Sequence, residues 1–167
     1  AALVKPYSEV NAFLRSDAVS GTVMADLDSV NYLSYRLKKK NAEVLNVKNP
    51  TAIMKAVKNA VEIENMKNIF LKDSVALTRF IKWVNTTDEK LTEMSASDRL
   101  LKFRQEIPEF RDLSFTTIAA YGSNGAIIHY EPSHDTETEI ERKGLFMVDS
   151  GGQYNGATTD VTRTIVM

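Results

Sequence analysis

Two aspartates, Asp149 and Asp160, lie eleven positions apart in a segment, residues 144–167, that predicts two strands joined by a tight turn. The pair Asn155-Gly156 favours a two-residue hairpin with positive φ at both central positions. In that register Asp149 lies opposite Thr162, and Asp160 lies one diagonal step away on the same face. Cβ atoms at that diagonal are roughly 7 Å apart or less, and carboxylate-bridged metal ions lie roughly 3.5 to 4 Å apart. The spacing therefore predicts that both carboxylates can reach one metal site.

Both aspartates also have an ordinary structural interpretation. Asp149 stands close to Gly151-Gly152, and aspartate near glycine is common in turns. Asp160, Thr162 and Thr164 alternate as the polar face of an edge strand would. A bulge at Gly151-Gly152 would shift the register and separate the carboxylates. The residues alone leave both interpretations open.

His129 is one of only two histidines, and it ends a short apolar run beside Tyr130. A lone histidine at such a place is more often a hydrogen-bonded core residue than a catalytic group, and one imidazole identifies no reaction. The other histidine, His134, lies in a charged loop and is expected to be solvated. It receives no role.

The elements that must position these residues follow from periodicity and turn signals. Strands at 22–26 and 43–47 with a helix at 29–40 predict a β-α-β arrangement, and Asn49-Pro50 marks a break. Three helices are expected at 51–58, 61–84 and 92–105, the second with an apolar face formed by Ile63, Met66, Phe70, Leu77, Phe80 and Val84. Asp73 interrupts that face, and we expect a hydrogen bond to a neighbouring group to hold it. The remaining expected strands are 115–121, 126–130, 144–149 and 158–166.

Composition indicates an ordinary folded protein, with 43% hydrophobic residues, 26% charged residues and a net charge of −1. The balanced charge provides no electrostatic footprint for nucleic acid. The only basic run, 38–40, is expected to be a solvated helix end. The chain has no cysteine, which fits a reducing compartment. Because no apolar stretch approaches the roughly 20 residues that span a bilayer, we expect no membrane association and a cytoplasmic location.

Several motifs resemble one enzyme family. Residues 149–154 (DSGGQY) followed by 159–164 (TDVTRT) resemble the paired metal-ligand motif of pita-bread metallopeptidases. Residues 113–118 and 124–132 resemble the substrate-side histidine segment of Xaa-Pro aminopeptidases (aminopeptidase P), and 54–59 and 92–98 also match in the expected order. The resemblance covers nearly the whole chain.

The resemblance implies an α+β fold. Residues 51–167 would form the first half of a pita-bread catalytic domain, and residues 1–48 would be the C-terminal part of a small α/β domain that precedes it. It also implies that Asp149 and Asp160 are ligands of two divalent metal ions, commonly Mn²⁺. His129 would bind the substrate or shuttle a proton. The reaction would be hydrolysis of the N-terminal peptide bond of a peptide with proline at position two.

The family's other metal ligands, a histidine and two glutamates, have no counterpart in this sequence. We therefore expect the longer parent protein to be the enzyme and this fragment to be inactive alone. Half of a duplicated fold exposes strand edges, so we also expect a homo-oligomer. The alternatives are a prolidase acting on Xaa-Pro dipeptides, a non-catalytic pita-bread module that binds peptides or proteins, and a metal-independent hydrolase of this fold such as creatinase.

Overall fold

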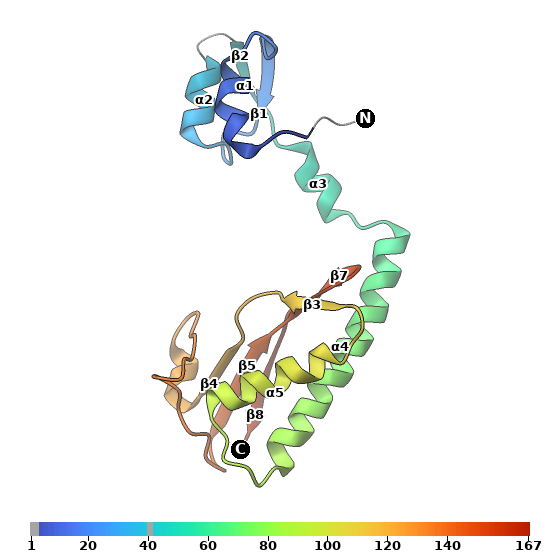
Figure 1. Cartoon of the computed structure of the whole chain (residues 1–167), viewed down its shortest axis with the longest axis vertical. Helices are drawn as coiled ribbons and strands as arrows, with labels where there is room; N and C mark the ends of the chain where they lie inside the picture. The colour runs from blue at the N-terminus through green and yellow to red at the C-terminus, as the bar shows by residue number, and fades with distance from the viewer. Residues whose placement is uncertain (1–3, 40–41) are drawn as a thin grey trace. The chain divides into compact units, whose positions relative to one another are not determined.

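The protein is described by a computed structural model that covers residues 4–39 and 42–167 (Figure 1). Its helices and strands separate into two units, residues 1–58 and 59–167. The assignment of residues 1–48 to a preceding α/β domain and of 51–167 to the catalytic fold stays a prediction. No helix in the described ranges is both long and apolar enough to cross a membrane.

The first unit contains the predicted β-α-β arrangement. Its two strands pair in parallel, with Gly21 opposite Ala42 and Ala25 opposite Asn46. A short N-terminal helix that sequence patterns did not predict packs against the connecting helix. The elements of this unit are η1 (Tyr7–Glu9), α1 (Val10–Arg15), β1 (Gly21–Ala25), α2 (Tyr32–Lys39), β2 (Ala42–Asn46) and α3 (Pro50–Ala56).

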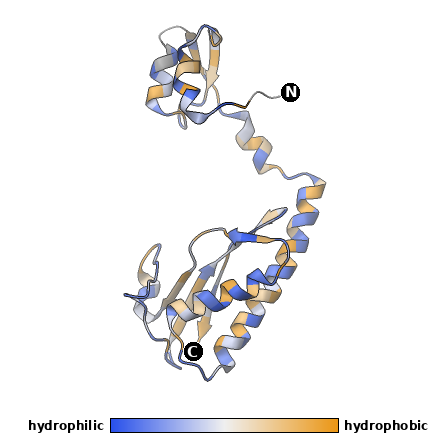
Figure 2. Ribbon diagram, in the orientation of Figure 1, coloured by the Kyte–Doolittle hydropathy of each residue, from blue (hydrophilic) through white to orange (hydrophobic). Residues whose placement is uncertain are grey.

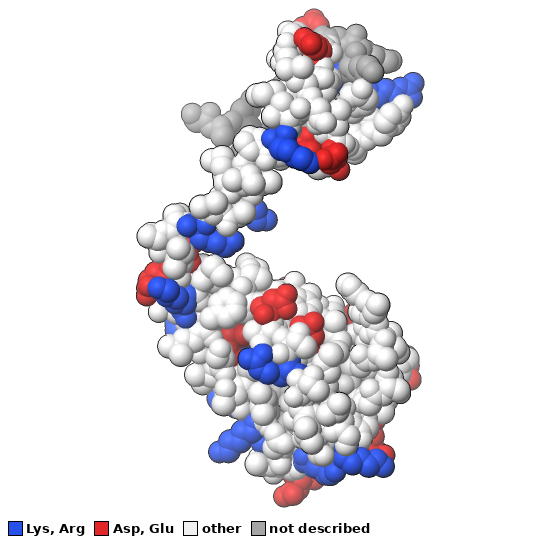
Figure 3. Space-filling view, turned by 180° about the vertical axis from the view of Figure 1, so that it is seen from behind, with Lys and Arg blue, Asp and Glu red and all other residues white. Residues whose placement is uncertain are grey.

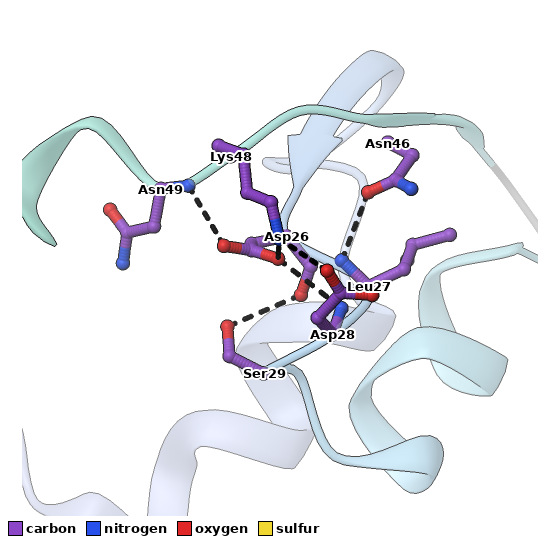
Figure 4. Close-up of polar contacts among 7 residues, drawn as sticks. All are labelled: Asp26, Leu27, Asp28, Ser29, Asn46, Lys48 and Asn49. Carbon is purple, nitrogen blue, oxygen red and sulfur yellow. Dashed lines mark hydrogen bonds and ion pairs between the residues drawn. The ribbon is translucent and has the colours of Figure 1, made fainter.

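A polar network at the carboxyl ends of β1 and β2 fixes the chain that leaves this small sheet (Figure 4). Asp26 Oδ2 accepts a hydrogen bond from Asn49 N at 3.0 Å, and Lys48 pairs with Asp28. The bond from Asn49 lowers the pKa of Asp26 below its ordinary value. Asn49 in turn caps α3, because its Oδ1 accepts from Thr51 N at 3.0 Å. The predicted break at Asn49-Pro50 is therefore a helix start, with proline in the first turn.

Lys38 corrects the expectation that the basic run is a solvated helix end. Its side chain is buried, and its Nζ donates to Leu14 O at 2.8 Å, at the end of α1. The apolar stem packs between the helices while the ammonium satisfies a carbonyl at a helix C-terminus. The side chain of Lys39 and the whole of Lys40 lie outside the described residues.

The second unit begins with the long helix α4 (Ala60–Thr86), which starts in a reciprocal cap. Asn59 Oδ1 accepts from Glu62 N at 2.9 Å, and Glu62 Oε2 accepts from Asn59 N at 2.8 Å. Apolar and polar residues alternate along the helix (Figure 2). Its buried residues are Ile69, Asp73, Ala76, Leu77, Phe80 and Val84. The predicted apolar face is therefore confirmed at Leu77, Phe80 and Val84, but it does not extend to the start of the helix, where Ile63 is 44% exposed.

The predicted third helix is α5 (Glu93–Gln105), and Thr92 is its N-cap in a reciprocal arrangement with Ser95. It packs against α4 and against β4 (Ile118–Tyr121). β4 belongs to an antiparallel sheet of order β4-β5-β8, with β5 (Leu145–Ser150) in the middle and β8 (Val161–Val166) outside. A second small sheet has the order β3-β6-β7, formed by β3 (Phe110–Leu113), β6 (Gly152–Tyr154) and β7 (Ala157–Thr158).

The core of this unit lies between the two helices and one face of the β4-β5-β8 sheet. The strands contribute Phe146, Val148 and Ile165, which pack against residues of α4 and α5 such as Phe80 and Leu100. Every one of these side chains is at most 7% exposed. Alternation along β5 therefore leaves its other residues, including Asp149, on the face turned away from the helices.

Asp73 connects three elements inside this unit. Arg104 Nε of α5 lies 2.8 Å from Asp73 Oδ1, and Tyr154 Oη of β6 donates to the same oxygen at 2.5 Å. Asp73 and Arg104 are at most 1% exposed. Burial raises the pKa of Tyr154, and its bond to Asp73 acts in the same direction, so the phenol stays a donor. The prediction that Asp73 is held by a neighbouring polar group is confirmed.

We predict that Asp73→Asn lowers the free energy of unfolding by about 3–5 kcal/mol, because it leaves the Arg104 charge buried without its counter-ion. Urea denaturation measures this loss. The matched control is Glu106→Gln, which removes a carboxylate from the solvent-accessible pair with Arg79. That change should cost less than about 1 kcal/mol. Equal losses for the two variants would contradict the role assigned to Asp73.

Candidate functional site

The hairpin between β5 and β8 has the register that the sequence predicts. Asp149 lies opposite Thr162, and Tyr154 lies opposite Ala157 at the turn. The strands are interrupted at Gly151, yet the pairing on both sides of the interruption follows one register. A register-shifting bulge at Gly151-Gly152 is therefore excluded. Asp160 directly precedes β8 and lies two positions before Thr162, the strand partner of Asp149.

The turn at its tip differs from the predicted one. Gly156 has φ of 98°, but Asn155 has no positive φ, so the expectation of positive φ at both positions is wrong. Contacts from outside the hairpin hold Asn155. Its N–H donates to Glu109 O at 2.9 Å, and its Oδ1 accepts from Arg111 Nε at 2.9 Å. Tertiary bonds thus override the local preference of the Asn-Gly pair.

Two glycines allow the hairpin to bend between its two sheets. A Cβ on Gly151 would lie 1.9 Å from Thr159 O and 2.3 Å from Ser114 Oγ. The two backbone segments cross at this point, and two hydrogen bonds of 2.9 Å each hold the crossing: Thr159 N donates to Gly152 O, and Gly152 N donates to Thr159 Oγ1. Since the crossing point lies directly after β5 and directly before Asp160, it fixes where the two aspartates stand.

Asp149 has an unusual environment for a strand carboxylate. Its Oδ1 is buried and has no hydrogen-bond partner within residues 4–39 and 42–167. Its strand neighbours on either side are Ile118 of β4 and Thr162 of β8. Asp160 is exposed. Figure 3 shows acidic side chains beside basic ones on one face of this unit. A buried acceptor oxygen without a protein donor is free to accept from a water or to bind a cation.

His129 lies in a loop, and the predicted strand at 126–130 is wrong. The chain forms the 3-10 helix η2 (Gly122–Ala126) and then a turn in which Tyr130 N donates to Ile127 O at 3.2 Å. His129 has φ of 56° and is the only non-glycine residue of the described chain with positive φ. It is exposed, so the interpretation as a core histidine is also wrong.

One pocket brings His129 and Asp149 together. It has a volume of about 280 Å³ and lies between the 125–129 loop and the open face of the sheet. The other lining residues are almost all apolar, namely Ile118, Gly125, Ala126, Ile127, Ile128 and Met147. The pocket therefore has a mixed lining, with apolar side chains around one carboxylate and one imidazole.

The remaining acidic and histidine residues do not complete a metal centre. Across the part of the chain that the structure describes, no three His, Asp or Glu side chains form a group that could hold a metal ion. His134 pairs with Glu137 at 3.5 Å and is 77% exposed, as expected of a solvated loop residue. The pocket therefore brings together one carboxylate and one imidazole, those of Asp149 and His129, and Asp160 is not among its lining residues.

Glu93 is the residue that sequence reasoning missed. It begins α5 and no role was predicted for it, yet it is fully buried. Tyr130 Oη donates to its Oε2 at 2.8 Å. Burial raises the pKa of Tyr130 to about 12, and the bond to Glu93 acts in the same direction. A glutamate beside the cap residue of an otherwise polar helix start is too common a pattern to have identified it.

Comparison with known proteins gives a consistent result. Residues 64–167 match metallopeptidase family M24. The chain is 41% identical to Xaa-Pro aminopeptidase 1 of Dictyostelium discoideum over 169 aligned positions, covering 97% of this chain and 26% of the relative. The chain thus spans about a quarter of the length of this curated relative.

Solved structures show the same fold. A cytosolic X-prolyl aminopeptidase with a di-nuclear active site from Caenorhabditis elegans matches with a TM-score of 0.82 and 28% identity, over 96% of this chain and 28% of that one. An Xaa-Pro dipeptidase from Bacillus anthracis matches with a TM-score of 0.70 and 24% identity, over 87% of this chain and 40% of that one. The mixed helix and strand architecture therefore agrees with the resemblance to the first half of a pita-bread domain.

We predict that Gly151→Ala destabilises the second unit by about 1–3 kcal/mol, because its Cβ cannot fit against the Thr159 carbonyl without a backbone shift. Urea denaturation measures the change. Gly125→Ala is the matched control, since a Cβ there meets no atom within 4 Å. It should change stability by no more than about 0.5 kcal/mol. Wild-type stability of Gly151→Ala would show that the crossing is looser than described.

Proposed function

The chain belongs to metallopeptidase family M24, and from this premise we propose that it carries part of the active site of an Xaa-Pro aminopeptidase. Such an enzyme hydrolyses the N-terminal peptide bond of a peptide whose second residue is proline. The names of the Dictyostelium and Caenorhabditis relatives support this activity for the longer protein. The observation that carries the proposal in this chain is the unpartnered buried oxygen of Asp149 beside the pocket that contains His129.

We propose that Asp149 and Asp160 hold two divalent metal ions. The donor set fits, because carboxylate oxygens are hard ligands that suit Mn²⁺, and Asp149 Oδ1 has no competing donor in the described residues. When bound, such ions supply a Lewis acid that lowers the pKa of water and stabilises the negative charge developing on a carbonyl oxygen. Thr162, directly opposite Asp149, would help to orient that carboxylate.

The pocket residues have separate roles in this proposal. The His129 imidazole stands at the pocket and would bind the substrate or move a proton through one of its ring nitrogens. Ile118 and Met147 provide an apolar floor next to Asp149. An apolar surface beside Asp149 lowers the local dielectric constant and strengthens the electrostatic interactions of that carboxylate.

We further propose that the 167-residue chain is inactive by itself. Asp149 and Asp160 provide at most four oxygens, which is too few to enclose two metal ions. Additional ligands would have to come from other parts of the longer protein. A cytoplasmic location is proposed from the composition and from the cytosolic Caenorhabditis enzyme. Exposed apolar residues on the open sheet face, such as Leu145 and Val166, support the proposal of a homo-oligomer.

A prolidase acting on Xaa-Pro dipeptides is the second candidate function, because the fold is shared with the Bacillus anthracis dipeptidase. The residues of this chain do not separate the two substrate lengths. A non-catalytic binding module is less well supported, since a module without chemistry has no need for a buried carboxylate oxygen left without a donor.

We predict that the chain binds Mn²⁺ weakly and that Asp149→Asn reduces the affinity by at least about tenfold, the size of effect that supporting residues of metal sites already have. Calorimetric titration with MnCl₂ measures the affinity. Asp135→Asn is the control, because Asp135 is an exposed loop residue that does not line the pocket. Equal affinity of the two variants would remove Asp149 from the metal site.

We predict that the 167-residue chain with Mn²⁺ releases no N-terminal residue from an Xaa-Pro-Xaa tripeptide, whereas the full-length protein does. Liquid chromatography of the reaction measures release. Turnover by the pure chain would refute the proposed inactivity, and turnover of Xaa-Pro dipeptides alone by the full-length protein would favour the prolidase.

Light scattering of the 167-residue chain tests the proposed homo-oligomer, and a monodisperse monomer at all concentrations would refute it.

A further inference from the structure

Glu93 stands out among the buried charged residues because its hydrogen-bond donors are all neutral. Its Oε1 accepts from Tyr121 N at 2.7 Å and from Asn124 Nδ2 at 3.0 Å. Its Oε2 accepts from Tyr130 Oη at 2.8 Å and from Thr138 N at 2.9 Å. Each oxygen thus receives one backbone and one side-chain donor. A buried carboxylate is tolerated only when its oxygens are satisfied in this way.

All four donors come from one stretch of chain, residues 121–138, which contains His129. Asn124 precedes His129 and Tyr130 directly follows it, so the carboxylate holds the loop on both sides of the histidine. The backbone adds a reciprocal bond, because Glu93 N donates to Thr138 O at 3.1 Å. One side chain at the start of α5 therefore binds this stretch of chain at four points.

The loop needs such support because His129 has a left-handed backbone. A non-glycine residue with φ of 56° costs free energy, and it persists only where the surrounding structure fixes it. His129 is also exposed, so packing of its own ring does not hold it. The anchors on either side, Asn124 and Tyr130, are the groups that Glu93 binds.

We propose that Glu93 is a positioning residue that holds His129 over the pocket next to Asp149. The inference rests on the proposed role of His129 at that pocket. Glu93 touches neither the pocket nor the substrate, and it acts only through the loop. Loss of its carboxylate should release His129 from the pocket while the helix and sheet core remain folded.

The test follows the nuclear Overhauser effect between the His129 ring and the Met147 methyl group, two groups that line the same pocket. The variants are Glu93→Gln, which replaces one acceptor oxygen by a donor, and Tyr130→Phe, which removes one anchor. The control is Tyr121→Phe, whose hydroxyl donates to Lys143 O at 2.8 Å and not to Glu93.

In Glu93→Gln we expect the His129–Met147 signal to disappear and the Thr138 amide to exchange about tenfold to a hundredfold faster, the effect of losing a bond to a charged acceptor. Val148 and Ile165 in the core should keep their exchange rates. Tyr130→Phe should weaken the same signal, and Tyr121→Phe should keep it. If Glu93→Gln fails to fold, Tyr130→Phe against Tyr121→Phe decides the outcome.

The proposal would be overturned if the His129–Met147 signal kept its wild-type strength in both Glu93→Gln and Tyr130→Phe. It would also be overturned if Tyr121→Phe lost this signal to the same extent as those two variants. Because this measurement needs neither metal nor substrate, a negative result would contradict the positioning role of Glu93 without contradicting the proposed enzymatic function. Line broadening by added Mn²⁺ makes the distinction. If Mn²⁺ broadens the His129 resonance no more than that of His134, the proposed metal site is refuted. If the His129–Met147 signal is lost in Glu93→Gln and Tyr130→Phe but not in Tyr121→Phe, the positioning role of Glu93 is supported.

Discussion

The close approach of two backbone segments at Gly151 and Thr159 is the constraint on which the rest of the site depends. A side chain at Gly151 would occupy the space of the Thr159 carbonyl, so only glycine allows the hairpin to bend there. The bend lets one continuous hairpin supply strands to two sheets, β5 and β8 to one and β6 and β7 to the other. Asp149 and Asp160 stand on the two sides of this crossing. Their placement is therefore set by backbone geometry.

The sequence predicted the parts of this arrangement that depend on local chemistry. Alternation and the Asn-Gly pair were sufficient for the register of Asp149 with Thr162. The turn type and the strand at 126–130 were predicted wrongly, because bonds from distant residues decide both. Glu109 and Arg111 hold Asn155, and Glu93 holds the loop around His129. The unpartnered Asp149 oxygen had no sequence signal, since it depends on which donors surround it in the fold.

Two buried carboxylates in the second unit are compensated in different ways. Asp73 faces the full charge of Arg104 and also accepts from Tyr154, and it joins α4, α5 and β6. Glu93 faces four neutral donors and joins α5 to a single loop. The first arrangement fixes the packing of the core. The second orders a loop in which residues 127–129 are exposed and so are held little by packing.

The position of Asp149 on the middle strand has a further consequence for ligand binding. β4 and β8 pair with both edges of the strand that carries Asp149, so the backbone of Asp149 is ordered when the protein folds. The entropic cost of ordering it is therefore part of folding and not of ligand binding. Asp160 lies outside the strands and is exposed, so ordering its side chain around a ligand would add an entropic cost to binding. The two carboxylates are therefore unequal partners. A cation would find the backbone of Asp149 already ordered, whereas its contact with Asp160 would include the entropic cost of ordering that side chain.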